Sequence, residues 1–320
     1  MTQVNTLSGR REFLFLYDIK MGNPNGDPDE NRPRVLPDGT HYVTDVRLKR
    51  FVRDFFKMKG HNILVDNIEG KTTNLTGRVI DYLKKNEKKE ANGSELVNIL
   101  LNAFVDARLF GSSFAFKKGK IEGKDWEPKT EPKTLTGAVQ FNMGEVLHDA
   151  EEVDILGTSV FGSGEDKTQG TFTSYYGLRY ALIGFSGVAN EHSAKISKLS
   201  DEDYDKMLTA LWQGIRSAGN TRTKLGQIPR LLISIEYKSG EEFQFGRLHD
   251  YVKLISFSGK NEKNWASPDD YVVDLGKIIT RIEEQKEKIE QIQYDVSPDI
   301  RFAQEMPKEW KKLKIEDKKI

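Results

Sequence analysis

Acidic and amide side chains gather near the start of the chain, where they could support metal chemistry. Asp18, Asp29 and Glu30 flank a turn-rich run, Gly22-Asn23-Pro24-Asn25-Gly26-Asp27-Pro28. Carboxylates in one loop could hold Mg²⁺ for a phosphoryl-transfer or nuclease reaction. Asp and Asn beside Gly and Pro also bond their own backbone in turns. We favour the turn interpretation, and a metal-dependent ribonuclease that uses Asp27 or Asp18 stays open as an alternative.

Other constellations that carry catalysis are missing from the sequence. The chain has no cysteine, which excludes a catalytic thiol, a Cys-ligated metal site and a disulfide framework. Neither Gly-x4-Gly-Lys-Ser/Thr nor Gly-x-Ser-x-Gly occurs, so no phosphate-cradling loop or nucleophile elbow is indicated. The five histidines are dispersed without metal-ligand spacing: His41, His61, His148, His192 and His249. We therefore predict no metal, no cofactor and no catalytic residue.

Two clusters of basic residues are more informative. The first is one face of a helix predicted over residues 46–57, which carries Lys49, Arg50, Arg53 and Lys57. The second is the window Met207–Ile235, which contains no acidic residue; its basic residues are Arg216, Arg222, Lys224 and Arg230. Either cluster alone could be a solvated face. Because both flank predicted core strands, we expect one continuous groove that neutralises phosphates without reading sequence.

Aromatic residues could supply the stacking half of single-strand recognition, because any base can stack on them. Phe13, Phe15 and Tyr17 share one face of a predicted strand, where core packing is the favoured role. Phe161 and Phe172 lie at equivalent heights on the two strands of a predicted hairpin. For this pair, wedging against bases or a neighbouring subunit and ordinary packing both stay open.

The elements that must position these residues follow from hydrophobic periodicity. Residues 12–18 are apolar on both faces, with Leu14 and Leu16 opposite the aromatics, which predicts a central strand covered on both sides. Residues 60–135 look like an insertion, with a short strand at 63–65 and exposed charged loops. The further predicted helices span 76–85, 94–107, 201–215 and 275–292, and the further strands span 135–141, 153–161, 170–185 and 228–237. The segment 246–257 is a candidate for the same sheet.

This order of elements predicts an α+β fold with an antiparallel sheet, such as a ferredoxin-like or RNA-recognition-like core. The insertion and the hairpin, whose tip over 162–169 holds no apolar residue, would decorate that core. A hairpin with such a polar tip should reach away from its own domain.

Composition limits the class of protein. The chain has 320 residues, with 49 Lys+Arg against 49 Asp+Glu, so bulk charge alone cannot hold nucleic acid, although a local basic groove can. With 37% hydrophobic residues it should fold into one large domain or two smaller ones. No apolar run approaches the roughly 20 residues of a bilayer span, and no secretory signal is visible. We therefore expect a soluble, cytoplasmic protein.

Several motifs together resemble a known family. The strongest are the strand, the Asn-Pro-Asn-Gly-Asp-Pro loop and the basic helix that follows them, over residues 13–20, 23–28 and 43–53. Further matches cover 135–141, 169–172, 176–180 and 216–218. This pattern is similar to the backbone subunit of type I CRISPR Cascade complexes, the seventh-numbered Cas family, within the repeat-associated RNA-binding superfamily. The type I-B (Csh) subtype is nearest, with type I-C (Csd) close to it.

The resemblance implies an RNA-recognition-like palm, a helical finger insertion and a projecting thumb β-hairpin. The corresponding boundaries are palm over 1–59, 135–156 and 176–320, finger over 60–134 and thumb over 157–175. Several copies would stack along one CRISPR RNA beside other Cascade subunits, grip the spacer phosphates and expose bases for pairing with target DNA. Base pairing would then read the sequence, as in another CRISPR effector. No membrane is implied.

Site residues carry over from the resemblance by position. Arg47, Lys49, Arg50 and Arg53 occupy the phosphate-gripping helix, and Asn23 and Asn25 occupy the loop that meets the RNA. The second basic segment contributes Arg216, Arg222 and Lys224, and the thumb contributes Phe161 and Phe172. A helical wheel places Arg47 to one side of the basic face.

The preferred function is a non-enzymatic RNA-binding scaffold. Its first rival is the ribonuclease named above, because backbone subunits of type III complexes cleave RNA through a loop Asp. A second rival is an RNA-processing endonuclease with a His general base. No His lies within either basic cluster in the sequence, which disfavours this second rival.

Overall fold

The computed structural model describes residues 6–88, 91–121, 123–128, 133–158, 172–218 and 224–315. Its centre is the strand β1 (Arg11–Gly22), which lies between β10 (Phe172–Ala189) and β11 (Ile228–Tyr237), antiparallel to both. The sheet order is β15-β14-β11-β1-β10-β8-β2, and β7 and β9 also pair with β10. Only the β14–β15 pair is parallel within the described sheet. The other strands of this sheet are β2 (Tyr42–Val43), β7 (Val139–Phe141), β8 (Gly144–Val146), β9 (Glu152–Thr158), β14 (Ile289–Val296) and β15 (Lys311–Lys312).

Both faces of the central strand are covered, as its apolar alternation predicted. Phe13, Phe15 and Tyr17 belong to a core shared with the helices α1 (Asp45–Met58) and α6 (Asp201–Ser217). Leu14 and Leu16 belong to a second core, built with residues from the C-terminal part of the chain. The sheet is therefore a middle layer, and its strand ends bring distant parts of the sequence together.

Local sequence explains how the two covering helices begin. Thr44 caps α1 by accepting a hydrogen bond from the Arg47 backbone N–H. Ser200 caps α6 in a capping box with Asp203. Acidic residues occupy the first turn, where they interact favourably with the positive end of the helix dipole. The short helix α5 (Glu191–Ser197) follows β10 and has its own cap, Asn190.

The C-terminal region differs from the sequence-based expectation. The helix predicted over 275–292 is wrong in its second half: α7 (Gly276–Glu284) ends early, and a 3-10 turn, η4 (Lys286–Lys288), leads into β14. The segment 246–257 does not join the main sheet. It forms η1 (Leu248–Tyr251) and β12 (Lys253–Ser256), which pairs only with β13 (Tyr271–Asp274). Two further 3-10 turns, η2 (Glu262–Asn264) and η3 (Pro268–Asp270), connect them.

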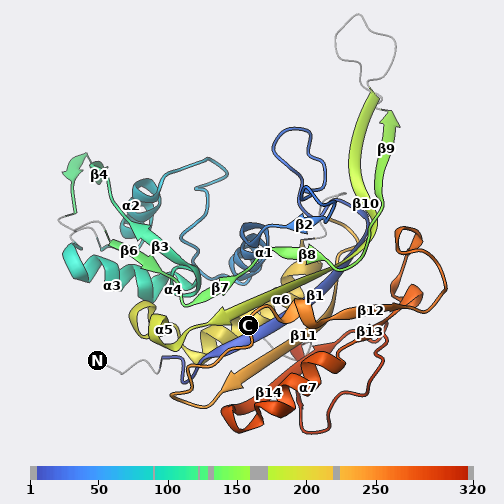
Figure 1. Ribbon diagram of the computed structural model, residues 1–320. Helices are drawn as coiled ribbons and strands as arrows, with labels where there is room; N and C mark the ends of the chain where they lie inside the picture. Colours follow the sequence, from blue (N-terminus) through green and yellow to red (C-terminus); the bar gives the residue numbers. More distant parts are fainter. Residues whose placement is uncertain are drawn as a thin grey trace, which may run out of the picture.

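The insertion after α1 has a hydrophobic cluster of its own and lies to one side of the sheet in Figure 1. Its helices are α2 (Leu75–Lys85), α3 (Gly93–Ala103) and α4 (Val105–Phe110). The helix predicted over 94–107 is interrupted at Phe104, which is extended and fully buried. The charged loop predicted over 117–133 instead contains β4 (Gly119–Ile121) and β5 (Lys124–Trp126), which pair with each other. A second small sheet joins β3 (Gly111–Phe114) to β6 (Lys133–Thr136).

A two-stranded hairpin projects from the far end of the sheet (Figure 1). It is formed by β9 and the first part of β10, with Thr158 opposite Phe172. Phe161 and the side chain of Phe172 lie outside the described part of the chain. Leu156 on β9 is exposed, as expected for a hairpin with few core partners. None of the described helices is long and apolar enough to cross a membrane.

Candidate nucleic-acid interface

The turn-rich loop after β1 is tied to the first turn of α1. The Asn25 side-chain oxygen accepts hydrogen bonds from the Thr44 backbone N–H at 2.9 Å and from the Thr44 hydroxyl at 2.8 Å. Since Thr44 in turn caps α1, Asn25 fixes where that helix starts. Asn25 therefore positions the basic helix, and its side-chain oxygen is already used for that purpose.

Asn23 joins the same loop to the segment before β11. Its side-chain amide donates to the Asn31 carbonyl at 2.6 Å, and its backbone carbonyl accepts a hydrogen bond from the Lys224 ammonium. The Asn23 side-chain oxygen is buried and has no hydrogen-bond partner within the described residues. Loop, α1 and the approach to β11 thus meet at one end of the central strand.

Two positive charges face each other at this end of the sheet. The Arg47 guanidinium lies 4.3 Å from the centre of the Phe51 ring and forms no ion pair with any described residue. Burial lowers the pKa of Arg47. Burial, with the nearby charge of Arg47, lowers the pKa of Lys224 to about 7. Bringing two cations together without a carboxylate partner is unfavourable in the free protein and favours binding of an anion.

Several buried polar atoms at this end of the sheet lack partners in the part of the chain that the structure describes. They are the Tyr17 hydroxyl, the Asn23 side-chain oxygen, the Arg47 Nε and both polar side-chain atoms of Gln227, whose backbone N–H donates to the Lys224 carbonyl. Each such group costs about 1–3 kcal/mol when it is left unsatisfied. We call Tyr17, Asn23, Arg47, Lys224 and Gln227 the Arg47 cluster. Its donors and charges suit a phosphate oxygen and a neighbouring hydroxyl.

The remaining cations of α1 are held by carboxylates of the same chain. Lys49 pairs with Asp45 at 2.9 Å, Arg50 with Asp54 at 2.5 Å and Lys57 with Asp66 at 2.6 Å. Arg53, which was predicted on the open basic face, is 8% exposed. Its Nε donates to Asp106 at 2.9 Å.

Asp106 explains why no strand forms over residues 63–65. The fully buried carboxylate accepts hydrogen bonds from the backbone N–H groups of Leu64 at 2.8 Å and Val65 at 3.1 Å. These donors are then unavailable for pairing with another strand. Through Arg53, the same carboxylate links the insertion to α1.

The second basic segment is only partly described. Arg216 is exposed in the last turn of α6, 6.0 Å from the centre of the Trp212 ring. Arg222 lies outside the described residues, so its distance from Arg53 is not defined. Arg230 is buried and donates to Asp18 at 2.7 Å and to Asp299 at 2.8 Å. Of this segment, Lys224 is the residue that the structure brings to α1.

The two candidate nuclease carboxylates have structural partners. Asp18 is buried, and it also accepts a hydrogen bond from the Tyr180 hydroxyl at 2.8 Å. Asp27 accepts hydrogen bonds from the backbone N–H groups of Asp29, Glu30 and Asn31, at 2.8–3.0 Å. These hydrogen bonds lower the pKa of Asp27. The favoured turn interpretation of Asp27 is confirmed.

The base of the hairpin is anchored beside the loop, by residues that sequence reasoning missed. Arg32 lies 3.7 Å from the centre of the Tyr176 ring and pairs with Glu152 at 2.7 Å. The Tyr175 hydroxyl donates to the Met21 carbonyl at 2.8 Å. Figure 1 shows the loop and the hairpin base at the same end of the sheet. No sequence pattern marks these contacts, because each joins residues more than a hundred positions apart.

Gln227 and Tyr17 were also missed as polar members of the site. Tyr17 lies in an apolar strand, and its ring is part of the core. Its buried hydroxyl has no hydrogen-bond partner among the described residues. Gln227 directly precedes β11 and carries no motif. A polar residue at the start of a buried strand was the available signal, and it is a weak one.

Comparison with known proteins identifies the family. The family described as CRISPR-associated protein Cas7 matches residues 9–276. A protein of that name from Haloferax volcanii is 32% identical over 297 residues, which cover 89% of this chain and 86% of the relative. The chain belongs to the Cas7 family. The match to Cas7 includes β1, the loop, α1 and the approach to β11, and therefore the whole Arg47 cluster.

The fold is also shared with solved structures. A chain of a CRISPR RNA-guided surveillance complex, in a pre-nicking state, superposes with a TM-score of 0.56 and covers 95% of this chain and 95% of its own length. Its sequence is 14% identical, so this likeness concerns the fold. The α+β architecture with a predominantly antiparallel sheet is thus confirmed for this Cas7 chain.

Proposed function

We propose that this chain is a non-catalytic backbone subunit of a type I CRISPR Cascade surveillance complex. It polymerises along CRISPR RNA with further copies of itself and other Cascade subunits, and presents bases for pairing with target DNA. Membership of the Cas7 family over most of the chain supports this role. Such a subunit works in the cytoplasm, where the guide RNA is. The loop-and-helix signature favours the type I-B subtype.

The Arg47 cluster is the phosphate grip of this proposal. The observation that carries it is the meeting of Arg47 and Lys224, two cations without a carboxylate partner in the described chain, among buried polar atoms without hydrogen bonds. A phosphate would satisfy both the charges and the donors. Asn23 belongs to the grip directly, and Asn25 acts through Thr44.

The other predicted RNA-binding residues have smaller parts in this proposal. Lys49 and Arg50 would have to leave their carboxylate partners before they could bind RNA strongly. Arg53 acts through the fold, because its guanidinium already pairs with a fully buried carboxylate. Arg216 and Arg222 both precede Lys224 in the sequence and are proposed to extend the grip along the RNA backbone.

The division into parts is likewise proposed. The sheet with its two covering layers would be the ferredoxin-like palm, and the insertion with its separate hydrophobic cluster would be the finger. The β9–β10 hairpin would be the thumb, with Phe161 and Phe172 as wedges between bases. The anchoring of its base beside the Asn23 loop favours a thumb that lies next to the phosphate grip.

A charge-matched pair of variants tests the grip. R47Q/K224Q and R50Q/K57Q each remove two positive charges, and Arg47, Arg50 and Lys57 lie on the same helix. We expect R47Q/K224Q to weaken binding to CRISPR RNA at least ~10-fold and to lower the salt dependence by about 0.7 per lost phosphate contact. R50Q/K57Q should stay within about twofold of the unaltered chain. Equal weakening by both variants would show that only overall charge matters.

The scaffold itself is tested by what the protein carries from its host. Mass spectrometry and RNA sequencing of the purified assembly should find CRISPR RNA and the other Cascade subunits. Incubation with complementary RNA and Mg²⁺ should leave that RNA intact. Periodic cuts that Asp27→Ala abolishes would overturn the non-catalytic role in favour of the ribonuclease.

A further inference from the structure

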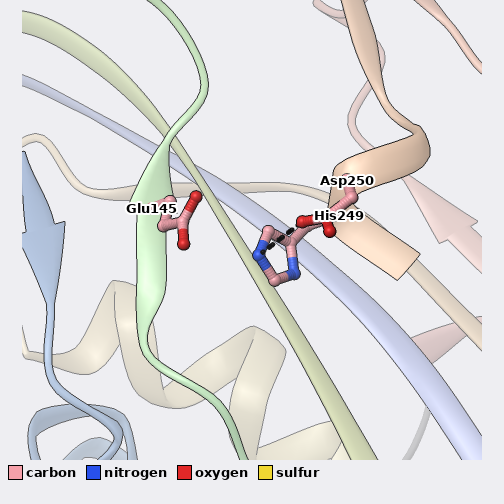
Figure 2. Close-up of side chains that lie close together, drawn as sticks. All are labelled: Glu145, His249 and Asp250. Atoms are coloured by element: carbon pink, nitrogen blue, oxygen red, sulfur yellow. Dashed lines mark ion pairs between the residues drawn. The ribbon is translucent and has the colours of Figure 1, made fainter. Parts of the chain in front are cut away.

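Three potential metal ligands converge on the sheet, and the Arg47 cluster includes none of them. Glu145 lies on β8, while His249 and Asp250 lie in η1. One ligand atom from each side chain lies within 4.8 Å of the other two. Figure 2 shows the three side chains turned toward one another from these two elements. No spacing in the sequence marks them, because Glu145 is far from the other two along the chain.

The imidazole of His249 is held in a fixed orientation. The residue is 2% exposed, and its backbone N–H donates to the Ser186 hydroxyl at 2.9 Å. The same hydroxyl lies 2.8 Å from Nδ1, on the side of the ring away from the carboxylates. Nε2 is thereby turned toward Asp250, whose Oδ1 lies at 3.4 Å. Outer hydrogen bonds of this kind hold histidine ligands ready for a metal ion.

A glycine in β10 lets His249 approach the sheet closely. Gly184 on β10 packs against His249, and a Cβ added there would lie 3.1 Å from the His249 Cβ. The Asn142 amide nitrogen is 3.3 Å from Nδ1 and 3.5 Å from Nε2. Because it is nearly equidistant from both, it lies beside the ring and is not aligned with either nitrogen lone pair. Nε2 is therefore left to the carboxylates.

The negative charge of the two carboxylates is only partly compensated by other side chains. Glu145 is half-buried, and its side chain makes no hydrogen bond or ion pair with any described residue, so its negative charge is uncompensated beside the ring. Asp250 pairs with Arg247 at 2.9 Å, but the Arg247 side chain is 72% exposed and easily displaced. Two carboxylates and one imidazole thus face a common point.

We propose that Glu145, His249 and Asp250 bind one divalent transition-metal ion of the Zn²⁺ or Mn²⁺ class. One nitrogen and two oxygen donors suit such ions, whereas Mg²⁺ and Ca²⁺ prefer oxygen donors alone. Metal–ligand distances of about 2.0–2.2 Å place opposite ligands up to ~4.4 Å apart. The observed spread needs only a small rotation of Glu145, and water completes the coordination. The ion would join β8 to η1 and stabilise the fold.

Metal titration of the full-length chain tests this site. The protein is treated with chelator, dialysed and titrated separately with Zn²⁺, Mn²⁺ and Mg²⁺ by calorimetry. We expect one Zn²⁺ or Mn²⁺ per chain, a rise in Tm on binding and no comparable response to Mg²⁺. E145Q should lower the affinity at least ~10-fold, and the matched surface variant E151Q should not.

A spectroscopic measurement separates this site from other carboxylates and histidines. Co²⁺ bound to the unaltered chain should give a visible absorption band, and E145Q and D250N should weaken it while circular dichroism stays unchanged. Unaltered affinity in E145Q, or no stoichiometric binding of Zn²⁺ or Mn²⁺, overturns the proposal. E145Q should bind CRISPR RNA normally, so the outcome is independent of the RNA-binding proposal.

Discussion

The first turn of α1 and the turns that follow it carry the same kind of charge in different electrostatic surroundings. Arg47, in the first turn, has no ion-pair partner in the described chain and lies near another cation, Lys224. Lys49, Arg50, Arg53 and Lys57 all have carboxylates within 4 Å. A count of basic residues would rank the later turns as the binding face. The available charge, and the unsatisfied donors around it, are at the start of the helix.

The largest expected effect is a loss of folding stability when a cation in the later turns of α1 is removed. Arg53→Ala should lower the free energy of unfolding by about 3–5 kcal/mol, because it leaves the Asp106 charge buried without its cation. Lys57→Ala, on the same helix with an exposed side chain, is the control and should cost less than about 1 kcal/mol. Urea denaturation measures both. A small loss for Arg53→Ala would mean that its carboxylate partner is solvated.

Measuring RNA binding by Arg53→Ala further distinguishes the later turns of α1 from its first turn. The folded fraction of Arg53→Ala should bind CRISPR RNA nearly as well as the unaltered chain. A double charge reversal of Lys49 and Arg53 cannot test the grip, because it would destroy the buried pair and lose binding through unfolding.

The next effect is a pH dependence of RNA binding that arises from Lys224, the cation near the first turn of α1. Lys224 has a pKa of about 7 in the free protein, and a bound phosphate raises it. Below pH 7 the ammonium is already charged; above pH 7, RNA binding must take up a proton. RNA affinity should therefore fall about tenfold between pH 6 and pH 8 at constant ionic strength. Lys224→Gln keeps every histidine and should flatten the profile. A slope that persists in this variant would assign the proton to another group.

The smallest effect tests whether positioning of the first turn matters. Asn25→Ala removes the acceptor of two Thr44 donors and should lower stability by about 1 kcal/mol. It should also weaken RNA binding several-fold, since the start of α1 loosens. Asn74→Ala removes the cap of α2 and serves as the control, because it should cost similar stability with no effect on RNA binding. Equal RNA binding by both variants would deny Asn25 its positioning role.

Sequence patterns predicted the elements whose hydrophobic residues fit a single period. The alternation around Phe13 and Leu14 gave the central strand and both cores, and Ser200 marked the start of α6. The pattern after Leu275 was ambiguous, because Ile289 and Ile292 extend a helical stripe that also suits a strand. Pairing with β11 decides for the strand, and that contact is not local.

The site was predictable only in part, for a related reason. The roles of the loop and of Arg47 were named only through the family resemblance, whereas Lys224 was marked by its window without acidic residues. The partner of Arg53 could not be named, because Asp106 lies in the insertion and meets α1 only in the folded chain. The helical wheel placed Arg47 to one side of the basic face, and in the structure Arg47 forms no ion pair with the carboxylates that neutralise the others.

The Arg53–Asp106 contact also ties the insertion to the helix that carries Arg47. The insertion and the helix that carries Arg47 cannot shift independently without separating opposite charges in a dry interior. A neighbouring subunit that pushes on the insertion would therefore also displace the first turn of α1. Contact at the insertion would in this way change the position of Arg47.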